Sequence, residues 1–184
     1  MDFEELIEKR KSYRALEPVE ITEEFIRKIA YQASRSASCA NKQPWRYVFV
    51  KSKDVLIRLH EVLSSGNYWA KEASMLIAVF SKKDYDCIAG EREYYLFGTG
   101  LATSQLILAI VNQGLVAHPM AGFNEDLAKT ILNIPKEMRL ITLIAVGKKT
   151  ENLAKLNEKH IEQEKVKSTR KNFDEFAYID SYRP

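Results

Sequence analysis

The sequence predicts one domain of three layers, α/β or α+β, in which helices cover both faces of a central sheet. Helical segments alternate with short apolar segments, and the run at 75–80 contains no polar residue, as in a strand buried on both faces. The 184 residues, 46% of them hydrophobic, suffice for one core. No repeat, low-complexity segment or linker interrupts this pattern, so we expect a single domain over 1–184. Periodicity alone does not give the strand order.

The first half of the chain is expected to alternate helix and strand. Phe3, Leu6 and Ile7 have helical spacing. Thr22 is a suitable N-cap for a second helix, whose apolar residues Phe25, Ile26, Ile29, Ala30 and Ala33 share one face. The segments that follow are predicted as a strand at 46–50 preceded by Pro44, a helix at 54–63 and a buried strand at 75–80.

The second half is expected to begin with a long helix at about 91–113, closed by Gly114. Its later part is apolar nearly all round, as in a helix that is central or covered by another subunit. Next come a strand at 115–118, a loop at 119–123, a helix at 125–132 capped by Asn124, and a strand at 140–146. Residues 148–172 are polar with weak helical character. Residues 173–182 carry several aromatic side chains and should therefore pack against another surface.

The charge balance excludes two classes of partner. The chain has 28 basic and 25 acidic residues, a net charge of +3, which argues against nucleic acid or an anionic membrane as the main partner. The longest wholly apolar runs, 75–80 and 106–111, fall far short of the roughly 20 residues that span a bilayer. The N-terminus lacks an apolar signal-peptide region, so we expect a cytoplasmic protein.

Cysteine and histidine spacing gives no support for a metal site. Cys39 and Cys87 are far apart and form no CxxC motif, so we expect partly buried free thiols rather than a zinc site or a disulfide. His60, His118 and His160 are scattered without a metal-binding or hydrolytic motif, and structural roles are favoured for them. The glycines at 98–100 lack the third glycine and the preceding strand of a dinucleotide fingerprint.

Three short stretches have the composition of a ligand site, although each also has a purely structural interpretation. "RKSYR" (10–14) suits a phosphate through its cations and hydroxyl, or is a solvated basic patch. "SASCANKQPW" (36–45) offers amides that could read a heterocycle, or satisfies its own backbone. "PMAGF" (119–123) leaves main-chain N–H groups open to a flat ligand, or is a simple turn. The basic stretch 165–171 is a solvated tail or a phosphate contact.

These stretches, in this order, resemble the motifs of the nitroreductase family of FMN-dependent oxidoreductases. "RKSYR" is similar to the family's N-terminal Arg-rich motif, and "SASCANKQPW" to its Ser-Pro-Ser-Ser-x-Asn-x-Gln-Pro-Trp motif. "GLATSQL" with "QGL", "PMAGF" and "TRK" resemble its later motifs. The chain departs from the family at Ala37, where Pro is usual, at Cys39, where Ser is usual, and at Gly98 and Ala121, where many members have Asp and some have Glu.

The resemblance implies an α+β fold with a mixed, largely antiparallel central sheet between helices. It further implies an intertwined homodimer that binds FMN at its interface. Arg10, Lys11, Ser12 and Arg14 of one subunit would hold the flavin, and residues 37–39 and Asn41 would approach from the other. Residues 119–122 would run along the isoalloxazine ring, with the N–H of Ala121 or Gly122 at N5. The expected cofactor-binding residues are Arg10, Lys11, Ser12, Arg14, Ala37, Ser38, Cys39, Asn41, Gln43, Pro119, Met120, Ala121, Gly122, Arg170 and Lys171.

The activity that the resemblance implies is hydride transfer from NAD(P)H to the flavin and then to a nitroaromatic, quinone or related acceptor, in a ping-pong scheme. The flavin carries the chemistry, so no side-chain acid or base is expected. Two alternatives stay open. One is a specialised flavin enzyme, a dehalogenase or enone reductase, with a pocket formed by 64–95, where Tyr68, Trp69, Tyr94 and Tyr95 either line the pocket or pack in the core. The other is a protein that stores or senses FMN.

Overall fold

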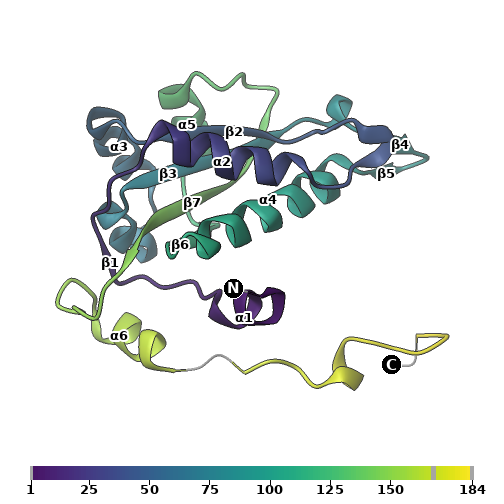
Figure 1. The fold of residues 1–184 in the computed structure, drawn as a ribbon. Helices are drawn as coiled ribbons and strands as arrows, with labels where there is room; N and C mark the ends of the chain where they lie inside the picture. The colour runs from purple at the N-terminus through teal and green to yellow at the C-terminus, as the bar shows by residue number, and fades with distance from the viewer. Residues whose placement is uncertain (1, 167–168, 183–184) are drawn as a thin grey trace.

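A five-stranded antiparallel sheet forms the middle layer of the computed structural model, which describes residues 2–166 and 169–182 (Figure 1). Every pairing among its strands is antiparallel in the described residues, so the predicted, largely antiparallel α+β fold is confirmed without a parallel pair. The strands are β1 (Leu16–Glu17), β2 (Arg46–Val50), β3 (Met75–Ser81), β6 (Val116–Met120) and β7 (Arg139–Lys149).

The long strand β7 organises the sheet. β3 pairs with it from Met75↔Val146 to Ser81↔Arg139, and β2 pairs with β3. β6 pairs with the same stretch of β7, from Val116↔Gly147 to Met120↔Leu143. Since a strand has two edges, β6 and β3 lie on opposite sides of β7. The short β1 pairs with the end of β7 through Leu16 and Glu17, which leads residues 10–15 to the margin of the sheet.

Helices cover both faces of this sheet, which confirms the three layers. On one face lie α2 (Glu23–Ser34) and α4 (Tyr95–Asn112), where Ile29 and Leu106 share a core with Met75, Ile77 and Val79 of β3. On the other face lie α3 (Lys53–Leu59) and α5 (Glu125–Leu132) with the 3-10 turns η2 (His60–Val62) and η3 (Ser65–Glu72). The intervening residues of β3 belong to that second core, as the two-residue repeat of a strand requires.

Two predicted helix starts are confirmed by their caps. The Thr22 hydroxyl accepts a hydrogen bond from the Phe25 N–H at 3.1 Å, and the Asn124 side chain accepts one from the Leu127 N–H at 3.1 Å. At the N-terminus, the helix predicted from Phe3, Leu6 and Ile7 is α1 (Phe3–Lys9), capped by Asp2.

Three boundaries differ from prediction. Residues 88–93 form a hairpin of β4 (Ile88–Ala89) and β5 (Arg92–Glu93) that turns at Gly90, whose φ is +63°, so the helix predicted from 91 begins at Tyr95. β6 continues through Pro119 and Met120, which were expected in a loop. Among the described strands β6 pairs with β7 alone, and an edge strand tolerates a residue without an N–H. β7 runs on to Lys149, and in 148–172 only α6 (Glu158–Lys165) is helical.

One side of the helix α4 is buried in the core and the other side is exposed. Among the described residues it is the one helix long and apolar enough to cross a membrane, a test that core helices of soluble proteins also pass. It packs on α2, β3 and β6, and 39% of its residues are buried. Leu96, Phe97 and Leu101 are exposed by 47%, 63% and 36%. The nearly all-round apolar sequence therefore leaves one apolar face of α4 in contact with solvent in a single chain.

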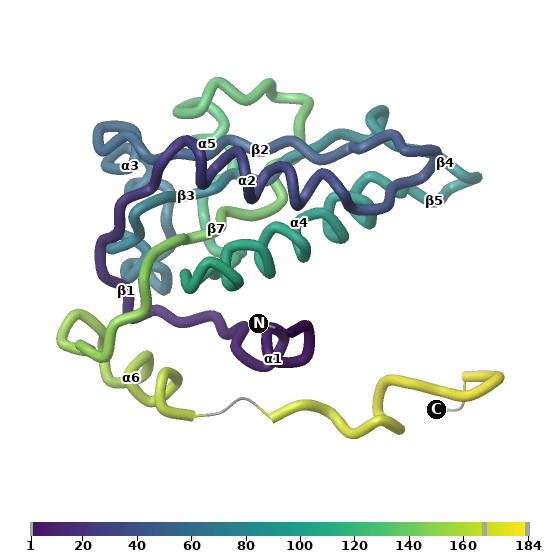
Figure 2. Tube along the Cα trace, viewed as in Figure 1, coloured from purple at the N-terminus to yellow at the C-terminus, as the bar shows by residue number. Residues whose placement is uncertain are grey.

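The C-terminal segment leads away from the sheet. After α6 the chain runs past α1 on the side remote from the sheet (Figure 2). Its aromatic residues contact one another, as in the ring pairs Phe173–Phe176 and Tyr178–Tyr182, yet Phe176 and Tyr182 are 64% and 72% exposed. A single described chain thus does not supply the surface on which these residues were expected to pack.

Gly122 is a point of close packing where a small change should have a large effect. A Cβ there would clash with Ser64 Oγ and would lie 3.1 Å from Asn67 Nδ2. We expect Gly122→Ala to lower the free energy of unfolding by about 1–3 kcal/mol, measured by urea denaturation.

The matched control is Gly66→Ala in the neighbouring 3-10 turn η3, where a Cβ meets nothing within 4 Å. Adding Ser64→Ala to Gly122→Ala should recover part of the loss, because it removes the nearest obstructing atom. Equal effects of Gly122→Ala and Gly66→Ala would contradict the packing argument.

Candidate functional site

A basic cavity of about 930 Å³ lies where the N-terminal segment meets the end of α6. Its walls come from 7–14 on one side and from residues between 163 and 170 on the other. Five of the predicted cofactor-binding residues line this one cavity: Arg10, Lys11, Ser12, Arg14 and Arg170. Two acids, Glu8 and Glu164, line the cavity as well, so its net charge is positive. Guanidinium groups with a hydroxyl are donors that suit a phosphate group.

Main-chain contacts fix the segment that carries these cations. The Arg14 N–H donates to Glu164 Oε1 at 2.7 Å, which joins the segment to α6. The Tyr13 carbonyl lies 3.1 Å from His118 Nδ1, which joins it to β6. Within the segment Arg10 Nη1 donates to Ser12 Oγ at 3.4 Å, so those two side chains converge. The cations are therefore carried on a backbone that is held at two points.

His118 is a buried neutral imidazole. It is 8% exposed, and its ring centroid lies 4.3 Å from that of Trp69. Burial lowers the pKa of His118 to about 4, against the hydrogen bond to the Tyr13 carbonyl, which raises it, and with the charge of Arg14, which lowers it further. Because a carbonyl only accepts, Nδ1 of the neutral ring carries the hydrogen. The structural role favoured from the sequence is therefore that of an anchor for Tyr13.

His118 should make the protein acid-sensitive. Its folded pKa of about 4 lies below the ordinary 6.5, so the unfolded chain takes up a proton first as the pH falls. Stability that is present above pH 6.5 is lost as the pH falls towards about 4, by at most about 3 kcal/mol. Denaturant titrations of the wild type and His118→Asn, whose amide can still donate to Tyr13, should converge over this window. A difference that is constant with pH would contradict the assignment.

A second, mostly apolar cavity of about 310 Å³ adjoins the first. It lies between α4 and the β6–β7 edge, with Leu96 and Ile107 of α4 facing Pro119 and Thr142. Arg10 lines both cavities, so this residue lies where the polar cavity meets the apolar one. A ligand with a charged end and a flat apolar end matches such a pair of cavities.

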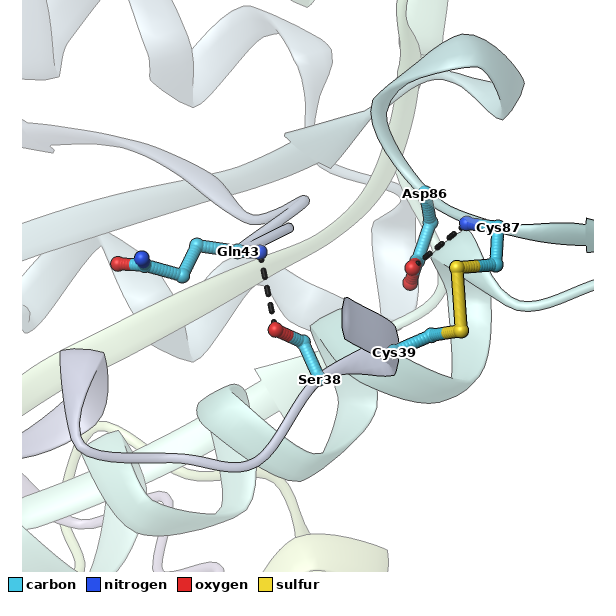
Figure 3. Close-up of a disulfide and its surroundings, with 5 residues drawn as sticks. All are labelled: Ser38, Cys39, Gln43, Asp86 and Cys87. Carbon is cyan, nitrogen blue, oxygen red and sulfur yellow. Dashed lines mark hydrogen bonds between the residues drawn. A yellow bond between two sulfur atoms is a disulfide. The ribbon is translucent and has the colours of Figure 1, made fainter. Parts of the chain in front are cut away.

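The loop 37–43 lies away from both cavities, beside the β4–β5 hairpin (Figure 3). Its Ser38 hydroxyl accepts from the Gln43 N–H at 3.0 Å, and Gln43 Nε2 donates to the Asn41 carbonyl at 3.3 Å. The loop therefore satisfies part of its own backbone, as its structural interpretation predicted. Ala40, Asn41 and Gln43 have φ of 47°, 55° and 49°, a left-handed conformation that costs free energy for residues other than glycine.

The prediction of two free thiols is wrong. Cys39 and Cys87 form a disulfide across 48 residues of sequence, with Cα atoms 5.9 Å apart (Figure 3). Sequence spacing could not reveal the pair, because the contact arises when the β4–β5 hairpin meets the loop. The disulfide fastens the left-handed stretch at Cys39.

Residues 119–122 fall into two environments. Pro119 lines the apolar cavity, and Met120 is buried in the core. The Gly122 carbonyl accepts from Asn67 Nδ2 at 2.8 Å and from the Ser64 N–H at 3.0 Å. In the described part of the chain the N–H groups of Ala121 and Gly122 donate to no other group, although neither residue lines the two cavities.

The structure thus brings together some predicted site residues and separates others. The N-terminal motif, Arg170 and Pro119 surround two adjoining cavities. The other predicted site residues do not line them: Ala37, Ser38, Cys39, Asn41, Gln43, Met120, Ala121, Gly122 and Lys171. Sequence reasoning missed Glu164 and underrated His118. Their partners, Arg14 and Tyr13, are 150 and 105 residues away, and no local pattern marks such pairs.

The layered antiparallel fold and the paired basic and apolar cavities define a class, that of proteins that bind a ligand with a charged end and an apolar end. The profile of the Nitroreductase family matches residues 7–68 and 62–148. The chain belongs to the nitroreductase family, which confirms the resemblance that its motifs indicated.

Individual relatives agree with this membership. A protein of Methanothermobacter thermautotrophicus, provisionally named NADH dehydrogenase/NAD(P)H nitroreductase, is 27% identical over 157 residues, covering 83% of this chain and 80% of its own. The crystal structure of an oxidoreductase containing FMN is 29% identical with a TM-score of 0.86, covering 100% of this chain and 94% of that one.

A third relative is iodotyrosine deiodinase 1 of Sus scrofa, which is 26% identical over 175 residues. The match covers 79% of this chain and spans 61% of the length of the deiodinase.

Proposed function

We propose that the chain binds FMN in the two adjoining cavities and passes a hydride from NAD(P)H, by way of the flavin, to a nitroaromatic, quinone or related acceptor. The general reaction class follows from family membership: the chain is an FMN-dependent oxidoreductase that uses FMN and NAD(P)H. The acceptor and the ping-pong order are the proposal.

The observation that carries the proposal is the convergence of Arg10, Arg14 and Arg170 on one cavity from opposite ends of the chain. The residues present fit FMN. Guanidinium groups with the Ser12 hydroxyl suit its phosphate, and the apolar compartment beyond Arg10 suits a flat ring system. Lys171 is exposed and does not line the cavity, so in our proposal Arg170 alone represents the late basic motif at the phosphate.

The free N–H groups of Ala121 and Gly122 are proposed as donors to the N5 edge of the ring. FMN, when bound, supplies the redox chemistry: it accepts a hydride from one substrate and returns electrons to another. The chain orients and stabilises. Arg10 holds positive charge between phosphate and ring, and the apolar walls around Pro119 exclude water. With the flavin oriented by such donors, the proposed hydride transfer needs no side-chain acid or base.

A homodimer is part of the proposal. The loop 37–43 lies apart from the cavities of its own chain, so we propose that it reaches the flavin of a second chain. The exposed apolar side chains of α4 and the exposed aromatic residues of 173–182 support this arrangement, because large apolar side chains that gather on an exposed face are characteristic of interfaces.

A second candidate function, reductive dehalogenation, is favoured by the similarity to a deiodinase. The segment 64–95 was expected to form the corresponding substrate pocket, with Tyr68 and Trp69 either in it or in the core. Trp69 is 2% exposed, and Tyr68 stacks on His160 at 5.4 Å, so both serve packing in the described chain. A third candidate, FMN storage or sensing, shares the binding site and differs only in turnover.

The decisive experiment measures turnover. The purified chain should contain FMN and should oxidise NADH or NADPH in the presence of nitro or quinone acceptors faster than free FMN does. Halogenated aromatics in the same assay test the dehalogenase function. FMN binding without turnover of any acceptor would favour storage, and a chain that binds no FMN would refute all three. The cytoplasmic location is likewise a proposal, which fractionation of the source cells tests.

A further inference from the structure

The disulfide has a third ligand-type group beside it that flavin chemistry does not use. Asp86 precedes Cys87, and one of its carboxylate oxygens and the two sulfurs lie within 4.8 Å of one another (Figure 3). Two cysteines and one carboxylate are a ligand set that zinc and similar thiophilic cations accept.

The Asp86 carboxylate is buried, and only one of its two oxygens accepts a hydrogen bond. It is 4% exposed, and its Oδ1 accepts from the Cys87 N–H at 2.8 Å. Its Oδ2 is buried and accepts no hydrogen bond, and within residues 2–166 and 169–182 no Lys, Arg or His forms an ion pair with it. A buried carboxylate oxygen that accepts no hydrogen bond is costly, and Oδ2 keeps its full capacity to bind a cation.

The fold makes room for this carboxylate. A Cβ at Gly98 in α4 would lie 2.8 Å from Asp86 Oδ2 and 3.0 Å from Pro44 Cγ. Any other residue at 98 would displace the carboxylate from its present place. The burial of Asp86 is therefore built into the contact between α4 and the segment that carries the cysteines.

We propose that Cys39, Cys87 and Asp86, once the disulfide is reduced, bind one thiophilic divalent cation of the zinc class. A dithiol reductant supplies two electrons and two protons, the S–S bond breaks to give two thiols, and the reductant becomes a disulfide. The cation then displaces both thiol protons and binds two thiolates and the carboxylate. A water molecule completes the tetrahedron.

The geometry suits this exchange. Zinc bonds of about 2.0–2.3 Å place tetrahedral ligands roughly 3.5 Å apart, so the three groups need only small shifts after the sulfurs separate. Neither cysteine is buried, which gives reductant and cation access, whereas Asp86 is fixed in the core. In either state a bond through Cys39 fastens the left-handed stretch of the loop.

The test uses the full-length chain with its flavin. The chain is reduced, freed of reductant without oxygen, and dialysed against Zn²⁺ or Cd²⁺, and metal per chain is counted by mass spectrometry. We expect one ion per reduced chain and none in the disulfide form. This comparison of the wild type with itself needs no variant to fold.

Variants identify the ligands. Cys39→Ser and Cys87→Ser should each abolish binding, and Asp86→Asn should weaken it by at least the roughly 10- to 100-fold that loss of an outer-shell partner costs. Asp84→Asn is the matched control, because that exposed acid lies two residues away and should leave the affinity unchanged. Equal metal binding by the oxidised and reduced chains, or unchanged affinity in a folded Asp86→Asn chain, would overturn the proposal.

Discussion

Replacing both Arg10 and Arg14 with alanine should leave a folded chain that no longer retains FMN. Each guanidinium lines the basic cavity, and charge-assisted hydrogen bonds to a phosphate contribute about 1.5–3 kcal/mol each. The pair should therefore raise the Kd for FMN by a few hundredfold or more. Flavin fluorescence during titration of the apoprotein measures the change.

The control is Arg27→Ala with Lys28→Ala, which removes the same charge from the exposed surface of α2, where Arg27 pairs with Glu23. Circular dichroism checks the fold, because Arg14 also lies over the Trp69 ring at 6.0 Å. Unchanged FMN affinity in the folded double variant would place the phosphate elsewhere.

A second large effect is expected at the exposed face of α4. Phe97→Glu with Leu101→Glu should convert a dimer to monomers and release FMN with it. Burying such a side chain contributes about 1.5–3 kcal/mol, and a charge in its place reverses the gain. Sedimentation analysis gives the oligomeric state, and absorbance at the flavin band gives the cofactor content.

Ile57→Glu with Leu127→Glu is the matched control. These residues are 52% and 37% exposed on α3 and α5, which cover the opposite face of the sheet. That variant should remain dimeric and yellow. A dimer that survives the α4 changes would show that the proposed interface lies elsewhere.

The sequence predicted what local physics determines. Thr22 caps α2 because its hydroxyl reaches an N–H three residues on, and β3 is buried because its apolar run has the length of a strand. The motif at 10–14 was found because cations and a hydroxyl are adjacent in sequence.

What the sequence could not give depends on distant contacts. The hairpin at 88–93 turns at one glycine in a polar stretch that also suits a helix. The pairing of Cys39 with Cys87, and of Arg14 with Glu164, follows from how whole elements pack. The residues near each partner in the sequence do not indicate such pairs, because the partner lies far away along the chain.

The disulfide also closes a covalent ring around part of the fold. The ring joins residues separated by 48 positions and contains β2, α3 and β3, two of the sheet's neighbouring strands among them. By loss of chain entropy in the unfolded state, a ring of this size is worth about 4 kcal/mol. The oxidised chain keeps these two strands tethered even when denatured, and a single backbone cut inside the ring would not release a fragment. Reducing surroundings, which open the disulfide, should therefore lower the melting temperature of the molecule.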